Sequence, residues 1–174
     1  MSPRNSAATD VILPMTDDYM QQIVDREKTH EFRRYLVSTS VKRVWFYLNA
    51  PKSHLQYICE IDPAHTRNPG DPPLPDDGAG NKEFNAHHKD WDKYDFAYRI
   101  LSVRELGAPI KLAEMRDKYG MKSAPRGLVY VPVALLNEVK WEEQRLLWSV
   151  DQEKERNPML PRRGNPTKLR ASDR

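Results

Sequence analysis

Hydrophobic and polar positions follow two different periods along the chain, and together they predict a mixed α and β domain. Residues 10–15 contain the apolar run Val-Ile-Leu-Pro-Met, which is typical of a buried strand. Met20, Ile23 and Val24 then recur at helical spacing in residues 17–25, and Thr16 is a candidate N-cap. We therefore expect a strand followed directly by an amphipathic helix at the start of the domain.

Further segments have the β-branched and aromatic composition of strands. In chain order they are residues 29–36, 42–48, 55–61, 94–103 and 127–131. Helical spacing predicts helices at 110–119, with Gly120 as a left-handed C-cap, at 133–138 and at 140–155. Because the strands lie too close together for repeated βαβ crossovers, the expected fold class is α+β, with a barrel-like sheet of about six strands flanked by helices.

Three stretches follow neither period. Residues 1–9 and 156–174 are expected to be disordered, which leaves residues 10–155 as the domain. Residues 62–93 form an insertion rich in proline and glycine. Loops of this length are usually functional lids or disordered insertions, and the sequence leaves both possibilities open.

Composition limits the classes of function. The formal net charge is +3, but residues 156–174 hold six basic residues against one acidic residue, so the first 155 residues carry −2. The basic character of the tail therefore gives no support to a basic groove on the domain. One cysteine, Cys59, allows no internal disulfide, and His87 and His88 fit no metal-loop spacing. We expect no metal, cofactor or membrane span, and an intracellular location, cytoplasmic or nuclear.

The segment KTHEFRR, residues 28–34, concentrates chemically useful side chains between a predicted helix and a predicted strand. By strand alternation, Thr29, Glu31 and Arg33 share one face, and Phe32 is the natural core residue of the other. The polar face has two interpretations. It is either the floor of a pocket that forms hydrogen bonds with the edge of a nucleobase, or the face of an ordinary strand that a Glu31–Arg33 ion pair stabilises.

The order VILPM, TDDYMQQIV and KTHEFR resembles the start of ASCH domains, which belong to the PUA-like superfamily with EVE-like and YTH-like relatives. The resemblance extends over residues 10 to about 137, interrupted by the insertion. It departs from the family pattern at residues 25–27, where a glycine is common. It implies a small β-barrel that handles RNA or modified nucleosides.

This resemblance implies binding of RNA or DNA, with a modified base as one possible target. The residues expected to take part are Lys28, Thr29, Glu31, Arg33, Arg34, Lys42, Arg43, Asn49, Trp91 and Arg126. The first four would form the pocket, with Asn49 and Trp91 opposite them, and the remaining arginines and Lys42 would hold the nucleic-acid backbone. A Trp91 that anchors its loop, and solvated charges at Lys42 and Arg43, are the simpler interpretations.

Two other functions stay open. Some ASCH relatives are amidohydrolases that act on a modified cytidine. Lys28 matches their catalytic lysine, Glu31 stands where they have a threonine, and Glu60 or Glu105 would supply a distant glutamate. Since Glu31 has no hydroxyl, the match is incomplete. The third possibility is a protein–protein adaptor that binds its partner through the predicted C-terminal helix.

Overall fold

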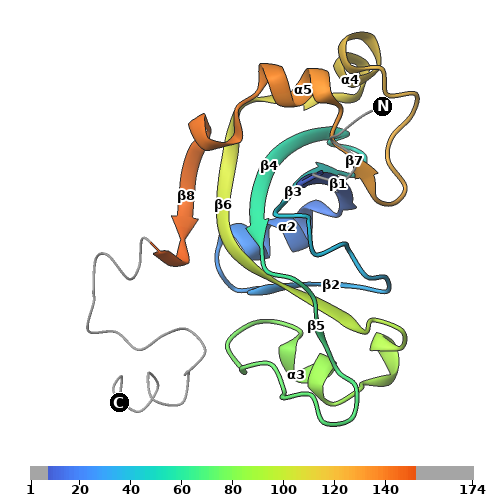
Figure 1. Ribbon diagram of the computed structural model, residues 1–174, viewed down its shortest axis with the longest axis vertical. Helices are drawn as coiled ribbons and strands as arrows, with labels where there is room; N and C mark the ends of the chain where they lie inside the picture. Colours follow the sequence, from blue (N-terminus) through green and yellow to red (C-terminus); the bar gives the residue numbers. More distant parts are fainter. Residues whose placement is uncertain (1–7, 152–174) are drawn as a thin grey trace.

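A single long strand, β6 (Phe96–Lys111), organises the sheet of the computed structural model, which describes residues 8–151 (Figure 1). The continuous strand order is β2-β6-β4-β3-β1-β7, and β5 and β8 also pair with β6. These strands are β1 (Asp10–Met15), β2 (His30–Arg33), β3 (Arg43–Leu48), β4 (His54–Ile61), β5 (His65–Thr66), β7 (Val129–Tyr130) and β8 (Arg145–Ser149). β1 and β3 are parallel, and the other pairs are antiparallel.

The helices lie at both ends and against the middle of this curled sheet (Figure 1). They are α2 (Asp17–Val24), α3 (Asn81–Asn85), α4 (Leu112–Tyr119) and α5 (Val133–Glu138), with 3-10 turns η1 (Lys89–Trp91) and η2 (Trp141–Glu143). Gly120 ends α4 in the left-handed region, at φ 74°, as its position predicted. Six strands on one continuous, curled path with flanking helices confirm the predicted α+β, barrel-like class.

The central strand β3 separates two hydrophobic cores. Val44, Phe46 and Leu48 enter the core that also contains α2, whereas Trp45 and Tyr47 enter the core under α4 and α5. A strand that is buried on both faces cannot alternate apolar with polar residues, which explains its continuous apolar run.

The predicted helix at 140–155 is wrong over residues 140–149. The turn η2 is followed by β8, which pairs with β6 so that Trp148 lies opposite Val103. Trp148 is buried and its Nε1 donates to the carbonyl oxygen of Ile23 at 3.2 Å. The run Leu146-Leu147-Trp148 fits either period, and pairing with the edge of β6 decides in favour of a strand. The C-terminal helix expected to receive a protein partner is therefore absent from residues 140–149, and only Val150 and Asp151, the last described residues, are helical.

The insertion at 62–93 is folded. It contains β5, α3 and η1, and its Leu74 and Phe84 form a small third core with Phe32 and Ala97. Phe32 is thus a core residue, as predicted, but of this small cluster. Strand β2 ends at Arg33, earlier than the predicted residue 36. β6 runs eight residues past the predicted end at 103, into the predicted helix at 110.

Residues 1–7 and 152–174 lie outside the described residues, so the expectations for both chain ends are untested there. Thr9 is described, and its carbonyl oxygen accepts from the backbone N–H groups of Lys42 and Arg43. No helix within residues 8–151 is long and apolar enough to cross a membrane.

Arg43 belongs to a structural ion pair at the start of β3. Its Nη2 lies 3.0 Å from Oδ1 of the buried Asp10, whose Oδ2 accepts from Nε1 of Trp45 at 2.8 Å. The guanidinium also stacks on Trp141, 4.6 Å from the ring centroid. Asn49 follows the opposite end of β3, so Arg43 and the exposed Lys42 lie at the other end of the strand from Asn49.

Removing this cation should destabilise the fold, because the Asp10 carboxylate would stay buried without its counter-charge. We expect Arg43→Met to lower the free energy of unfolding by about 2–3 kcal/mol in chemical denaturation. Lys42→Met removes the same charge from an exposed neighbour and should change it by less than about 0.5 kcal/mol. Equal effects of the two substitutions would contradict the structural role of Arg43.

Candidate functional site

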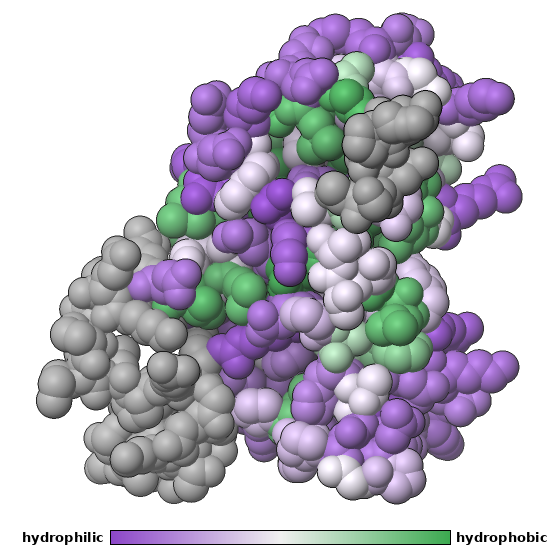
Figure 2. Space-filling view, viewed as in Figure 1, coloured by the Kyte–Doolittle hydropathy of each residue, from purple (hydrophilic) through white to green (hydrophobic). Residues whose placement is uncertain are grey.

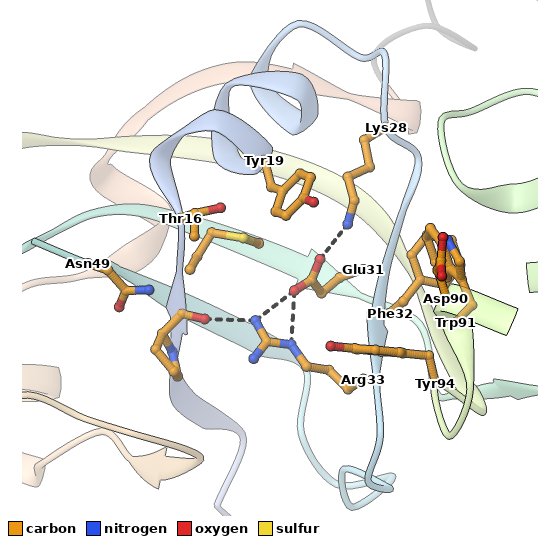
Figure 3. Close-up of a pocket in the computed structure, with 12 residues that line it drawn as sticks. Thr16, Tyr19, Lys28, Glu31, Phe32, Arg33, Asn49, Asp90, Trp91 and Tyr94 are labelled. Atoms are coloured by element: carbon orange, nitrogen blue, oxygen red, sulfur yellow. Dashed lines mark hydrogen bonds and ion pairs between the residues drawn. The ribbon is translucent and has the colours of Figure 1, made fainter. Parts of the chain in front are cut away.

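A cavity of about 560 Å³ opens where β1 and β3 end and where η1 faces β2 (Figure 3). Its lining comes from four parts of the chain: the β1–α2 junction, the β2 strand with Lys28 before it, the turn after β3, and the folded insertion with the residues that follow it. The lining residues are Pro14, Met15, Thr16, Tyr19, Lys28, Glu31, Phe32, Arg33, Asn49, Asp90, Trp91 and Tyr94.

Three ionised side chains form the floor of this cavity. Lys28 Nζ lies 2.6 Å from Oε1 of Glu31, and Arg33 Nη2 lies 2.6 Å from Oε2. Arg33 also donates from Nε to Glu31 at 2.9 Å and from Nη2 to the carbonyl oxygen of Pro14 at 2.8 Å. The side chains of this Lys28–Glu31–Arg33 triad are 8%, 8% and 15% exposed, so three charges with a net charge of +1 are held almost out of water.

The carboxylate stays ionised in this setting. Burial raises the pKa of Glu31, but the charges and hydrogen bonds of Lys28 and Arg33 outweigh burial, so its pKa is lowered overall. Burial lowers the pKa of Arg33, while Glu31 and Tyr35 raise it, and the net shift is upward. Glu31 and Arg33 therefore both stay ionised across the physiological pH range.

Aromatic rings surround the charged floor. Phe32 and Trp91 pack edge to face with centroids 4.7 Å apart, and Tyr94 lies 6.1 Å from Trp91. Lys28 Nζ lies 5.1 Å from the centroid of Phe32 and 5.7 Å from that of Tyr19. Tyr19 is 55% exposed, so its ring is open to a ligand at the mouth of the cavity.

Arg67 holds the aromatic wall in place. Its Nη2 donates to the carbonyl oxygen of Trp91 at 2.8 Å, its Nη1 donates to that of Phe84 at 3.0 Å, and its Nε pairs with Asp95 at 3.1 Å. Gly80 lies so close to Trp91 that a Cβ there would be 2.5 Å from the indole. The insertion thus places Trp91 in two roles at once, since it anchors its own loop and lines the cavity.

The structure brings five of the predicted site residues to the cavity: Lys28, Glu31, Arg33, Asn49 and Trp91. The predicted Glu31–Arg33 ion pair is present. Arg34 lies beside the cavity, with its guanidinium 4.7 Å from the ring centroid of Tyr94. The roles of these residues in binding stay predictions.

Thr29 does not line the cavity, although alternation placed it beside Glu31. The strand begins only at His30, and Thr29 lies under the insertion. Its Oγ1 accepts from Nδ2 of Asn81 at 3.2 Å and lies 2.8 Å from Nδ1 of His30. A Cβ on Gly78 would lie 2.4 Å from that oxygen, so the hydroxyl is enclosed by protein.

The other predicted residues also lie outside the cavity lining: Lys42, Arg43, Arg126, Glu60 and Glu105. Glu60 accepts a hydrogen bond from Ser102 at 2.8 Å, and Glu105 accepts from Gln56 at 3.0 Å and pairs with Arg145. Neither carboxylate lines the cavity that contains Lys28. Residues 8–151 contain no group of three side chains arranged to hold a metal ion.

Sequence reasoning missed several lining residues, among them Thr16, Tyr19, Asp90 and Tyr94. Thr16 was assigned to a helix cap, and it does occupy the N-cap position of α2, but its side chain makes no capping hydrogen bond. An exposed aromatic side chain in the first turn of an amphipathic helix is a signal that could have identified Tyr19, because it is not needed for the core.

The Lys28 and Arg33 charges depend on Glu31, so its neutralisation should be costly. We expect Glu31→Gln to lower the free energy of unfolding by about 3 kcal/mol, because two buried cations would then face each other without an anion. Glu27→Gln is the matched control, since Glu27 is exposed and should change stability by less than about 0.5 kcal/mol. Urea denaturation of both variants measures the difference, and a small change for Glu31→Gln would contradict the ion-paired floor.

His30, next to the triad, should make stability depend on pH. Burial first, and then the charges of Arg99, His65 and Lys28, lower its pKa from 6.5 to about 3. Below pH 6.5, His30 therefore binds a proton in the unfolded chain but not in the folded chain. The free energy of unfolding consequently decreases as the pH falls from 6.5 towards 3. Between pH 7 and pH 5 the loss from His30 should be about 2 kcal/mol, and denaturation of His30→Gln at both pH values should show a smaller loss. The same pH dependence in both proteins would contradict a neutral, buried His30.

The comparisons with known proteins support the fold. No protein-family model matches the sequence, and no curated protein matches it. Among solved structures, the chain is similar to ASCH from Zymomonas mobilis, with 14% identity, a TM-score of 0.54, and coverage of 75% of this chain and 95% of that one. Two mutant structures of the same protein match with 14% and 16% identity and TM-scores of 0.55 and 0.56. At these identities the similarity concerns the backbone arrangement, and the chain has the fold of an ASCH domain.

Proposed function

We propose that this protein binds nucleic acid by placing an unpaired base, standard or modified, in the cavity over the Lys28–Glu31–Arg33 triad, with RNA as the preferred partner. The observation that carries the proposal is the combination of a buried, hydrogen-bonding floor of net positive charge with aromatic walls. Unpaired RNA bases are commonly recognised by stacking on aromatic rings together with hydrogen bonds to their edges.

The dimensions and the walls of the cavity fit such a ligand. A volume of about 560 Å³ lies within the range of small-molecule pockets. Tyr19 at the mouth and Trp91 and Tyr94 on the wall provide ring faces and edges on different sides of the opening. Each base stacked on an aromatic side chain contributes about 1–3 kcal/mol to binding.

Basic side chains outside the cavity would meet the phosphates. Arg34 is exposed and stacks on Tyr94, and Lys52 lies in the turn after β3 with its side chain 46% exposed. Such contacts fix the position of the strand without reading its sequence. Lys42, Arg43 and Arg126 are not part of this proposed interface, because they do not line the cavity.

The adaptor function has less support. Its predicted helix is β8, with Trp148 buried and Trp141 stacked under Arg43 and Arg104. On the face shown in Figure 2, hydrophobic side chains form separate patches among hydrophilic ones and no broad apolar surface. The hydrolase function also has less support, because neither candidate for its distant glutamate, Glu60 or Glu105, lines the cavity.

Binding should depend on Tyr19. We expect the full-length protein to bind single-stranded RNA with an affinity that falls with salt, and Tyr19→Leu to weaken binding by about fivefold or more. Tyr130→Leu is the matched control, because Tyr130 is 49% exposed and lies outside the cavity lining. Fluorescence anisotropy with labelled single- and double-stranded RNA and DNA, at two salt concentrations, measures the affinity of each protein for each nucleic acid.

A salt-sensitive affinity that both tyrosine variants retain would contradict the proposal, since the basic residues 156–174 would then account for the binding. Release of a product from RNA or from an acylated nucleoside, lost on Lys28→Met, would favour the hydrolase function instead.

A further inference from the structure

We propose that the cavity selects a base with an imide edge, the –CO–NH–CO– arrangement of uracil and thymine, over cytosine and adenine. This inference rests on the proposed function, because it assigns the base that the same cavity accepts. The argument comes from the order of donors and acceptors along the triad.

The three side chains present donor, acceptor and donor in sequence across the floor. The Glu31 carboxylate lies between Lys28, on the side of Oε1, and Arg33, on the side of Oε2 (Figure 3). An imide edge presents acceptor, donor and acceptor in sequence. One carbonyl oxygen would accept from Lys28, the imide N–H would donate to Glu31, and the second carbonyl oxygen would accept from Arg33.

Each of the three side chains still has an unused hydrogen-bond donor or acceptor for the imide edge. An ammonium group has three N–H donors, and among the described residues Lys28 uses one of them for Glu31. Oε1 of Glu31 accepts the Lys28 bond and has a second lone pair. Arg33 donates from Nε and Nη2 to Glu31 and Pro14 and also hydrogen-bonds the side chain of Tyr35, which leaves at least one of its five N–H groups for a ligand.

The other bases fit this floor less well. Cytosine presents an amino group, a ring nitrogen acceptor and a carbonyl, so its amino group would meet a cation and its ring nitrogen would meet the carboxylate. Adenine presents an amino group and a ring nitrogen acceptor, with the same conflict. Guanine matches Lys28 and Glu31 with its carbonyl and ring N–H but turns its amino group towards Arg33. We therefore expect guanine to be intermediate.

The triad is fixed before a ligand arrives, which makes it suitable for discrimination. Lys28 and Arg33 are held by Glu31, and Arg33 is held additionally by the carbonyl oxygen of Pro14 in β1. A donor group of the wrong base cannot easily push these cations aside, because the burial of all three side chains leaves little room for rearrangement. A wrong ligand leaves buried polar groups of the site without hydrogen-bond partners, and it therefore binds much more weakly than the matching ligand.

The test compares ligands that differ at this edge alone. Single-stranded oligomers of about eight nucleotides suit the expected site size: oligouridylate, oligocytidylate, oligoadenylate, oligothymidylate and an oligomer of N3-methyluridine. We expect oligouridylate to bind at least about tenfold more tightly than oligocytidylate or oligoadenylate. The N3-methyl group removes the imide donor while the rest of the base is kept, so it should abolish this advantage. Oligothymidylate tests whether the cavity also binds the imide edge of a base in DNA.

A variant separates edge recognition from general attraction. Lys28→Met leaves the Glu31–Arg33 pair in place and should reduce the preference for uridine over cytidine to about threefold or less, whereas Lys42→Met removes an equal charge outside the cavity and should preserve the preference. Circular dichroism of both variants checks folding, and the N3-methyluridine comparison needs no variant at all.

The possible failures are distinct. Binding that depends on Tyr19 but is equal for uridine, cytidine and N3-methyluridine oligomers would overturn the imide preference and leave the proposed function intact. Binding that depends on neither Tyr19 nor the base would overturn both.

Discussion

The backbone hydrogen bonds of β6 are the constraint on which the site depends. Its sixteen residues pair with β2, β4, β5 and β8, so one strand joins the curled sheet to the folded insertion. β2 carries Glu31 and Arg33 and, within residues 8–151, pairs with β6 alone, with Glu31 opposite Tyr98. β5 pairs with the first residues of the same strand and brings the insertion over Phe32. The charged floor and the aromatic wall of the cavity are therefore positioned by one element.

The Lys28–Glu31–Arg33 triad is hard to explain by stability. Removing three charges from water costs several kcal/mol per ion, and replacing buried ion pairs with apolar residues is often neutral or stabilising. The two cations and one anion of the triad do not neutralise one another, so the floor has a net charge of +1. Asp10 and Arg43 form a contrasting pair with balanced charges, and Asp10 also receives the indole N–H of Trp45. The excess charge of the triad, together with its position in a cavity, is what favours a ligand rich in acceptors.

The insertion illustrates how a stretch without secondary-structure periodicity can still contribute to a site. Its prolines and glycines predict turns, and its few apolar side chains are too widely spaced to suggest a core. Leu74 and Phe84 become buried because Phe32 and Ala97 present an apolar surface at the end of the sheet, and Arg67 connects the loop through three hydrogen bonds. The cohesion of this segment comes from contacts with residues distant in sequence, so composition could not distinguish a folded insertion from a disordered one.

The sequence by itself determined the α+β class and the strand and helix at residues 10–24, because these depend on local periodicity. It also offered the Glu31–Arg33 ion pair as one of two interpretations, because these residues are two apart on one face of a strand. It also identified Lys28, Glu31, Arg33, Asn49 and Trp91, which the structure places around one cavity. Only the tertiary structure decided that residues 145–149 form a strand, that Thr29 lies under the insertion, and that Lys42 and Arg43 lie at the far end of β3. It also added Tyr19 and Tyr94 to the cavity. These outcomes depend on which segments meet in space, and local patterns carry no information about partners that are remote along the chain.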